Sequence, residues 1–347
     1  MRYNPALDGL RALAVLSVVC FHCQGPWFGG GYLGVDIFFV LSGYLITLLL
    51  ATEHASGGIQ VGRFYARRAL RLYPTLLLML AAYLVLAPTL WPGDDRWLNA
   101  VLAGTYVTDY SLPYWRVPHY PPVVGHTWSL AVEEKFYLVW PLLLPLLSRA
   151  KRPIAWLLVA FVMATTWRWI AAHARAWPMA YFPFDARLSG LLLGSIAALA
   201  RPKVSGAVAA IAGICLAITV VVPGLPSPPG LAPVDAVTLV VTLAELSAFL
   251  VVCHVADRID TPVLAAPPLV YVGRLSYGIY LWHFPVILWL RERLPVWPTL
   301  GLTLAISFIL AAVCLHFVDT PIKRWRRRLL PNAAVGTANQ LRRPAWD

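Results

Sequence analysis

The chain alternates long apolar runs with short polar segments over most of its length. Ten runs are candidates for membrane-spanning helices, since crossing a bilayer takes about 20 apolar residues. A shorter apolar piece, 97–107, predicts a re-entrant or interfacial helix. The pattern therefore predicts an all-α fold, a polytopic transmembrane helix bundle with about ten spans. The ten runs are roughly 9–25, 33–50, 72–90, 126–147, 154–170, 183–200, 204–222, 236–256, 270–290 and 299–318.

Composition agrees with a membrane protein. Of the 347 residues, 59% are hydrophobic and 13% are charged, whereas soluble domains are about 45–50% apolar and about 25% charged. The net charge of +12 would suggest a nucleic-acid partner in a soluble protein. Here Lys and Arg lie between apolar runs, eighteen on one side of the predicted topology and six on the other. The positive-inside rule then predicts cytoplasmic termini, a multi-pass protein of the inner (cytoplasmic) membrane and no nucleic-acid partner.

The apolar runs follow one another without room for a soluble domain. Residues 1–328 are therefore predicted to form one membrane domain, and 329–347 a short, disordered cytoplasmic tail. Asp8 and Arg11 interrupt the first run, which is typical of a retained helix and not of a cleavable signal. The Pro- and Gly-rich segment 223–235 is interpreted as a linker.

Two ionisable residues, Arg11 and His22, lie within the first apolar run. Eleven steps of about 100° amount to about three turns plus 20°, so both side chains lie on one helix face, roughly 16 Å apart along the axis. Ionisable groups are costly at this depth and mark functional sites, and histidine exchanges protons near neutral pH. The pair predicts an enzyme site inside the bilayer; the alternative is a histidine bonded to a neighbouring carbonyl.

A carboxylate opens the second run, at Asp36 in GYLGVDIFF. A short glycine-containing turn separates the first two runs, so the two helices are predicted to be antiparallel neighbours, with Asp36 at about the depth of His22. A carboxylate beside an imidazole can fix its tautomer and stabilise its cationic form. The alternative is an interfacial aspartate exposed to water.

A compact group of arginines precedes the third run. Arg67, Arg68 and Arg71 fall within about one helical turn, with Arg63 shortly before them. Guanidinium groups bind phosphates bidentately. The same cluster would also serve as a topology signal that contacts anionic lipid, and both interpretations remain open.

The fourth run, HTWSLAVEEKFYLVW, is unusually rich in polar residues. His126, Ser129 and Glu133 recur at three and four residues, so they share one helix face. Glu133, Glu134 and Lys135 are consecutive charges, which is expensive inside a span. A Glu–Lys pair would be purely structural, but this density of polar groups predicts a helix that lines a cavity.

Two later runs carry further candidates. FDARLSG places Arg187 in the first turn of one predicted helix. In GRLSYGIYLWHF, the residues Ser276, Tyr280 and His283 follow a helical stripe. Aromatic stripes usually serve packing, so Tyr280 is interpreted as a packing residue, whereas His283 lies near the middle of the membrane and is a stronger functional candidate.

All five cysteines lie within apolar runs, which indicates buried free thiols. Cys20 and Cys23 flank His22 with a spacing that metal and redox motifs also use. Two thiols on a lipid-embedded helix more often serve packing, so no metal site is predicted.

Seven of these segments, in order across residues 7–324, give the chain a family resemblance. It resembles the acyltransferase-3 family of integral membrane acyltransferases, and residues 1–328 would then form the acyltransferase domain. The segments are LDGLRALAVLSVVCFH, GVDIFFVLSGYLI, RFYARRALRLYP, HTWSLAVEEKFYLVWP, RLSGLLLG, GRLSYGIYLWHFPV and FVDTPIKR.

The resemblance implies an activity. An enzyme of this kind moves an acyl group, often acetyl, from cytosolic acyl-CoA to a hydroxyl of a carbohydrate or glycolipid acceptor, such as O-antigen, exopolysaccharide or a related glycan. Acyl-CoA is then the co-substrate, and the lipid bilayer surrounds the enzyme. Acylation of a small secreted natural product is an alternative. A glycan or lipid transporter is a rival class that visible inverted repeats would have favoured, and none is found.

The resemblance also implies roles for particular residues. The family's Arg-x10-His motif falls on Arg11 and His22, and its RxxR motif falls on Arg68 and Arg71. Arg67, Arg68 and Arg71 would hold the CoA phosphates, and Arg11 would orient CoA. His22 would then deprotonate the acceptor hydroxyl or form a covalent acyl-histidine.

Asp36 would assist His22 in this mechanism. Two positions depart from the family pattern, because Ser189 and Asp319 stand where relatives often carry an acidic residue and a glutamate. The candidates for acceptor binding or oxyanion stabilisation are His126, Ser129, Glu133, Glu134, Arg187, Tyr280 and His283.

Overall fold

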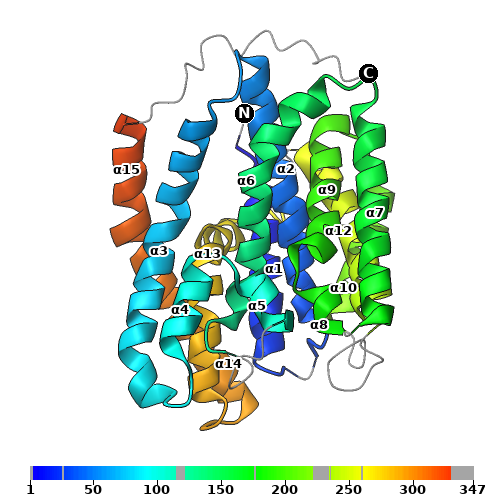
Figure 1. Cartoon of the computed structure of the whole chain (residues 1–347). Coiled ribbons are helices and arrows are strands. Elements are labelled where there is room, and N and C mark those ends of the chain that lie inside the picture. Colours follow the sequence, from blue (N-terminus) through cyan, green and yellow to red (C-terminus); the bar gives the residue numbers. More distant parts are fainter. Residues whose placement is uncertain are drawn as a thin grey trace.

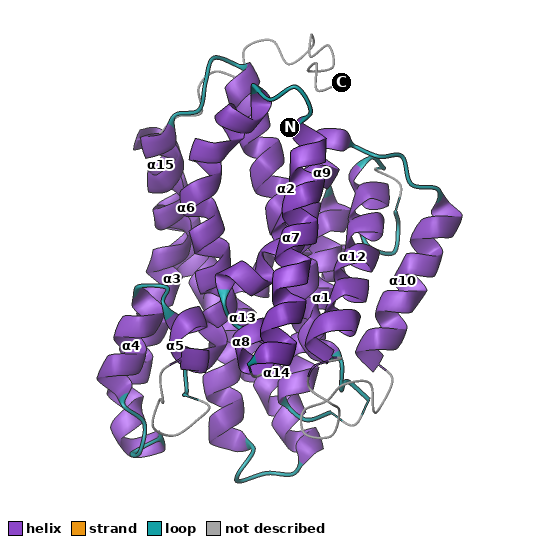
Figure 2. Cartoon of the chain, turned by 45° about the vertical axis from the view of Figure 1, so that its right-hand side comes forward, coloured by secondary structure: helices purple, strands orange, loops and turns teal. Residues whose placement is uncertain are grey.

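The computed structural model describes residues 3–25, 27–114, 122–175, 177–221, 234, 236–258 and 261–329. Within them the secondary structure is helical, with no strand in the described part of the chain (Figures 1 and 2). The predicted tail, apart from residue 329, and nearly all of the predicted linker lie outside the described residues.

The helices follow the apolar runs. Their bounds are α1 Pro5–His22, η1 Gly31–Leu33, α2 Gly34–Ala55, α3 Val61–Leu90, α4 Arg96–Gly104, α5 Thr108–Tyr114, η2 Gly125–Thr127, α6 Trp128–Ser148, α7 Pro153–Ala174, α8 Trp177–Tyr181, α9 Phe184–Ala200, α10 Gly206–Val221, η3 Ala236–Val240, α12 Val241–Ala256, α13 Pro267–Leu290, α14 Val296–Cys314, η4 Leu315–Asp319 and α15 Thr320–Leu329.

A helix occupies each of the ten predicted runs, and α4 occupies the predicted short apolar piece. Seven helical segments in the described residues are long and apolar enough to cross a membrane. Of the other three, α10 has only 16 residues, and α6 carries three consecutive charges. The all-α fold is confirmed, whereas the number of spans and the side on which the termini lie stay predictions.

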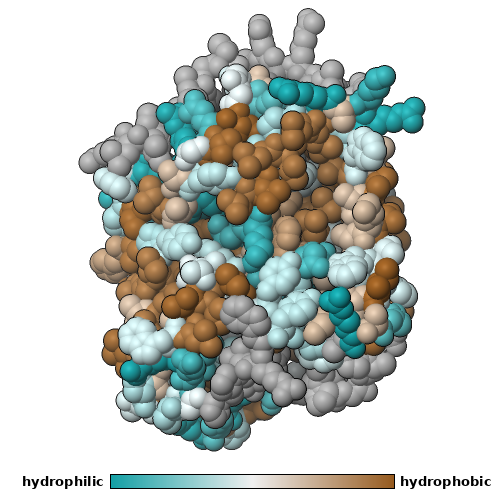
Figure 3. Space-filling view, viewed as in Figure 1, coloured by the Kyte–Doolittle hydropathy of each residue, from teal (hydrophilic) through white to brown (hydrophobic). Residues whose placement is uncertain are grey.

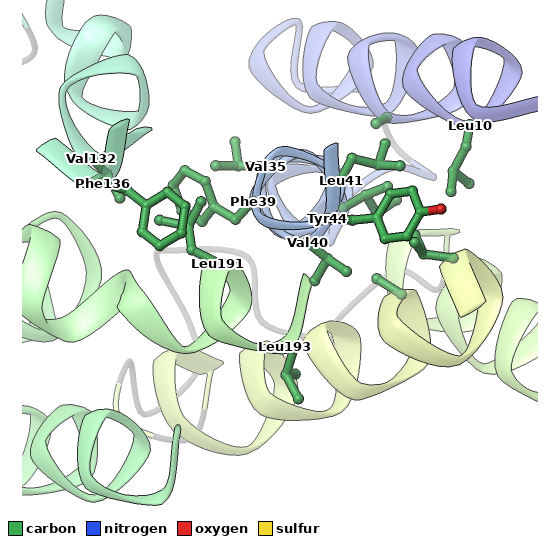
Figure 4. Packing of buried hydrophobic residues seen from close by; sticks show 14 of the residues in the cluster. Leu10, Val35, Phe39, Val40, Leu41, Tyr44, Val132, Phe136, Leu191 and Leu193 are labelled. Carbon is green, nitrogen blue, oxygen red and sulfur yellow. The ribbon is translucent and has the colours of Figure 1, made fainter. Parts of the chain in front are cut away.

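Helices α2 and α9 form the centre of the bundle. Side chains radiate from α2 towards α1, α6 and α9 (Figure 4), and most of α9 is buried. Glycine permits the close approach: a Cβ on Gly43 would lie 2.0 Å from the Leu191 carbonyl oxygen, and one on Gly194 would lie 2.1 Å from that of Val40. Small residues at such crossings let membrane helices pack backbone to backbone.

The outer surface of the bundle is apolar. Brown, hydrophobic residues cover most of its side in Figure 3, while hydrophilic residues gather at the two ends and along a seam in the middle of this face. Trp156, Val162 and Ile211 are among the large apolar side chains that are well exposed. This is the surface expected of a protein surrounded by lipid, where apolar side chains face outward.

The face of α1 that carries His22 packs against α13. A Cβ on Gly273 would lie 1.9 Å from the carbonyl oxygen of Asp8, so the two backbones nearly touch. Helices α1, α2, α3, α6, α13 and α15 surround the interior space described next. The turn between α2 and α3, whose residues line part of that space, lies at the upper end of the bundle in Figure 1, where α1 also begins.

Candidate active site

A cavity of about 730 Å³ runs into the bundle from the turn between α2 and α3. Its outer end includes Ser56, Gly57 and Gln60, which are exposed. Its inner end includes Ser129 and Tyr280. Small-molecule pockets measure about 300–1,000 Å³, so this one is large enough for a substrate.

Arginines from three parts of the chain line this cavity. They are Arg11, Arg67, Arg68, Arg71 and Arg326, from α1, α3 and α15. Three of them have an acidic neighbour within 4 Å among the described residues, whereas Arg71 is exposed to the cavity and has no hydrogen bond or ion pair with a described residue. Arg326 Nη1 donates to the Arg67 carbonyl oxygen at 3.0 Å.

The other arginines are held by specific partners. Arg67 lies 3.3 Å from Glu53, and Arg11 lies 3.6 Å from Asp8. Arg68 Nε lies 3.6 Å from Glu134, and the Arg68 guanidinium stacks 3.7 Å from the ring centroid of Tyr137. These contacts fix the guanidinium groups at the cavity wall, and Arg71 is the one best placed to meet an anion.

Of the three residues on the predicted polar face, Ser129 and Glu133 of α6 line the cavity, whereas His126 lies in η2 and does not. Glu133 accepts hydrogen bonds from Ser42 (2.6 Å) and Tyr137 (3.1 Å), so its hydrogen-bond partners among the described residues are hydroxyl groups. Lys135 points elsewhere, donating to Asp109 at 2.6 Å. The possible Glu–Lys pair within α6 is therefore replaced by a link from α6 to α5.

Tyr280 closes the inner end of the cavity. Its hydroxyl donates to the His126 carbonyl oxygen at 2.6 Å, because a carbonyl can only accept. The Ser129 hydroxyl lies 2.6 Å from the Tyr280 oxygen and therefore donates to it. The interpretation of Tyr280 as a packing residue is confirmed by its place in the hydrophobic core, and its hydroxyl in addition links α6 to α13.

Three histidines lie just beyond Tyr280. His22 Nδ1 is 3.0 Å from His283 Nε2, and the rings of His126 and His283 are 5.4 Å apart. Phe284 packs between them, with its ring 4.8 Å from that of His22 and 5.2 Å from that of His126. Helices α1, η2 and α13 thus bring together residues that are far apart in the sequence.

The hydrogen bonds of this trio define which nitrogens carry protons. His283 Nδ1 lies 2.6 Å from the Tyr280 carbonyl, so it donates there. In a neutral ring Nε2 is then an acceptor, and His22 Nδ1–H must supply the proton between the two rings. This leaves a lone pair on His22 Nε2. His22 is partly exposed, and that nitrogen is free to act as a base or nucleophile.

The prediction that Asp36 lies beside His22 is wrong. The Asp36 carboxylate pairs with Arg187 at 2.5 Å, and both side chains are fully buried between α2 and α9. The Arg187 guanidinium also lies 4.9 Å from the ring centroid of Tyr181. The two helices are rotated about their axes so that these side chains point in different directions. His22 faces α13, whereas Asp36 at the start of α2 faces α9.

A second buried ion pair lies beside the first. Arg168 forms two 3.0 Å hydrogen bonds with Glu245 of α12, and the hydroxyl of Ser189 donates to that carboxylate at 2.7 Å. Arg168 is one of the six Lys and Arg residues on the second side of the predicted topology, and it is fully buried in α7. In the described residues, no group of three or more His, Cys, Asp or Glu side chains is placed to bind a metal ion.

Comparison with known proteins agrees with this architecture. The model of the acyltransferase-3 family, described as an acyltransferase domain, matches residues 4–318. The chain belongs to the acyltransferase-3 family. Together with the apolar helices, this makes it a multi-pass membrane protein. No solved structure matches it.

Two curated relatives are longer proteins. The chain is 32% identical to the peptidoglycan O-acetyltransferase OatA of Listeria monocytogenes over 93% of its own length and 56% of that protein. It is 30% identical to the O-acetyltransferase OatA of Staphylococcus aureus, over 93% of its own length and 58% of that protein. The chain thus spans a little over half the length of these relatives.

The two residues of the family's Arg-x10-His motif lie at different ends of the site. Arg11 is at the cavity wall, and His22 lies beyond Tyr280. The sequence also left residues unassigned that the structure places here: Arg326, which α15 brings back to the cavity, and Tyr137 beneath Arg68. The helical spacing of Tyr137 from Glu133 was a usable signal, whereas nothing local in the sequence pointed to Arg326.

Proposed function

We propose that this protein is a membrane O-acetyltransferase that transfers an acetyl group from cytosolic acetyl-CoA to a hydroxyl of a cell-envelope carbohydrate. The observation that carries the proposal is a cavity with arginines along its wall and Tyr280 at its inner end, where the Tyr280 ring lies 5.4 Å from that of His283, the hydrogen-bond partner of His22. The names of the two OatA relatives support acetyl as the group and a carbohydrate such as peptidoglycan as the acceptor.

The cavity suits a long donor with an anionic head. Arginine binds phosphate through paired N–H donors, so Arg71, with Arg11, Arg67 and Arg68 near it, would hold the phosphates of CoA. Phe64, Leu72 and Tyr277 supply apolar surface along the wall. The thioester would then lie at the inner end. If the arginine end faces the cytoplasm, as the positive-inside rule predicts, the donor enters from the cytosol.

The transfer step balances with the groups present. His22 Nε2 takes the proton of the acceptor hydroxyl while that oxygen attacks the thioester carbonyl carbon. The C–O bond forms, the C–S bond breaks, and the CoA thiolate takes the proton from the imidazolium. Because the cavity ends at Tyr280 and His22 is not among its lining residues, the Tyr280 side chain must shift for the thioester to reach His22.

The roles of the other predicted residues follow from their contacts. His283 orients His22, in place of the carboxylate expected from the sequence. His126 donates Nε2–H to the Leu281 carbonyl, and its Nδ1 has no hydrogen-bond partner among the described residues, so that an acceptor hydroxyl could bind there. Asp36 and Arg187 act as a structural pair.

The test uses the purified protein in nanodiscs with acetyl-CoA and a soluble peptidoglycan fragment as acceptor. His22→Ala should lower kcat about 10²- to 10⁴-fold, the usual contribution of a general base, without changing the thermal unfolding midpoint. His173→Ala is the matched control, because His173 is an exposed histidine at the end of α7. Full activity of His22→Ala would refute the assignment of His22 as the general base. If the wild-type protein did not consume acetyl-CoA, acetyl-CoA would be refuted as the donor.

A further inference from the structure

Three hydroxyl-bearing residues of α6 and α13 line the cavity: Ser129 and Tyr280, which are hydrogen-bonded to each other, and Ser276, one helical turn before Tyr280. Two of their hydroxyl protons are already donated in hydrogen bonds within the protein, since Ser129 donates to Tyr280, and Tyr280 donates to the His126 carbonyl. Ser276 differs: its side chain is 0% exposed, and its oxygen has no hydrogen-bond partner in the described part of the chain. Of these three hydroxyl groups, that of Ser276 is the one whose proton is not already donated within the described residues.

A helical serine normally satisfies its own hydroxyl. Ser195 donates to the Leu191 carbonyl one turn earlier at 3.0 Å, and Ser42 donates to a carboxylate. Serine hydroxyls that bond the preceding turn are common in helices. Ser276 uses neither route, although buried polar groups are almost always paired. A buried donor that lines a substrate cavity and lacks a protein acceptor indicates that a substrate atom is the acceptor.

The position of Ser276 on α13 defines which substrate atom that is. Ser276 precedes Tyr280 by four residues and His283 by seven, so all three share a face. At ~1.5 Å per residue, Ser276 lies roughly 6 Å before Tyr280 and roughly 10 Å before His283 along the axis. This is too far from His22 to stabilise the oxyanion of the transfer step, but it is on the path of the donor.

We propose that Ser276 donates a hydrogen bond to the amide carbonyl of the donor arm that is nearest to the thioester. In a pantetheine thioester, two methylene groups separate that amide from the sulfur, so anchoring it at Ser276 extends the acyl group towards Tyr280 and the trio. The chemical class of the ligand is therefore an N-acylcysteamine thioester. This inference rests on the proposed function, since it assumes a thioester donor.

The test compares two small donors in a double-mutant cycle. S-acetyl-N-acetylcysteamine keeps the amide and the thioester but has no phosphates, and S-pentyl thioacetate replaces the amide by methylene groups. Wild-type protein should show a KM about 3- to 10-fold lower for the amide donor, the size of one neutral hydrogen bond. In Ser276→Ala that advantage should disappear with kcat unchanged. Ser276→Cys, whose thiol is a weaker hydrogen-bond donor of similar size, should retain part of the preference for the amide-containing substrate.

Ser307→Ala is the matched control. Ser307 on α14 is also fully buried and without a hydrogen-bond partner in the described residues, but it does not line the cavity. It should keep the wild-type preference between the two donors. A Ser276→Ala protein that still prefers the amide donor would overturn the inference while leaving the enzyme active. No turnover of any thioester by wild-type protein would instead overturn the proposed function.

Discussion

The hydrogen bond between His22 and His283 can be tested with two partial mimics of histidine. A glutamine at 283 places an amide oxygen near the position of Nε2, where it can still accept from His22 Nδ1–H. An asparagine places its amide near the position of Nδ1, where it can still donate to the Tyr280 carbonyl but cannot reach His22. His283→Gln and His283→Asn therefore separate the two hydrogen bonds of the His283 ring, the one with His22 and the one with the Tyr280 carbonyl.

The size of the effect follows from what each variant leaves unpaired. In His283→Asn, the buried Nδ1–H of His22 loses its acceptor, which costs about 1–3 kcal/mol. At about 1.36 kcal/mol per factor of ten, kcat should fall about 5- to 150-fold. In His283→Gln, the His22 bond survives and the lost bond is the one to Tyr280, so kcat should fall by less than about tenfold. KM for acetyl-CoA should change little in either variant, because the trio lies beyond the end of the cavity.

The assay is steady-state acetyl transfer at saturating acceptor, with thermal unfolding measured on the same preparations. The expected order of kcat is wild type, then His283→Gln, then His283→Asn. The reverse order would show that the Tyr280 carbonyl bond matters and that His283 does not orient His22. Equal losses in both variants, with equally lowered unfolding midpoints, would show that His283 serves packing only.

Two further predictions concern the charged residues. Arg71→Ala should raise KM for acetyl-CoA about tenfold (about 1.4 kcal/mol) and leave KM for S-acetyl-N-acetylcysteamine unchanged. Arg67→Ala should raise KM for acetyl-CoA less, because Glu53 already neutralises Arg67. If Arg71→Ala changed KM equally for both donors, a contact between Arg71 and phosphate would be contradicted. Asp36→Ala should destabilise the protein by about 3–5 kcal/mol because it leaves Arg187 buried and unpaired. Replacing both Asp36 and Arg187 by leucine should lower the stability clearly less. Thermal unfolding in nanodiscs measures the stability of both variants, and a double variant less stable than Asp36→Ala would refute a purely structural pair.

The helices could be predicted from the sequence because each apolar run is a local pattern. The one-face argument for Arg11 and His22 needed only helical periodicity, and the two residues do belong to a single helix, α1. The partner of His22 was a different problem. Choosing Asp36 required knowing how α1 and α2 are rotated about their axes, and the turn between them does not reveal this. The actual partner, His283, is 261 residues away.

The departures from the family pattern show the same limit. Ser189 stands where relatives often carry an acidic residue, and its hydroxyl donates to the carboxylate of Glu245 on α12. The negative charge near Arg168 is therefore supplied from another helix, which no local motif could indicate. Asp319 accepts a hydrogen bond from Thr75 at 2.7 Å, so it links α3 to the segment before α15.

The distribution of charge is consistent with a histidine, and not a carboxylate, as the hydrogen-bond partner of His22. A buried carboxylate beside the three histidines would have to be desolvated without a cation to pair with it, which is costly in an apolar interior. The carboxylates of Asp36 and Glu245 are instead each bound to an arginine. A neutral imidazole fixes the tautomer of His22 and adds no charge. In the proposed transfer step the imidazolium and the oxyanion then form together as a neutral pair, so the site gains no net charge in a medium that opposes it.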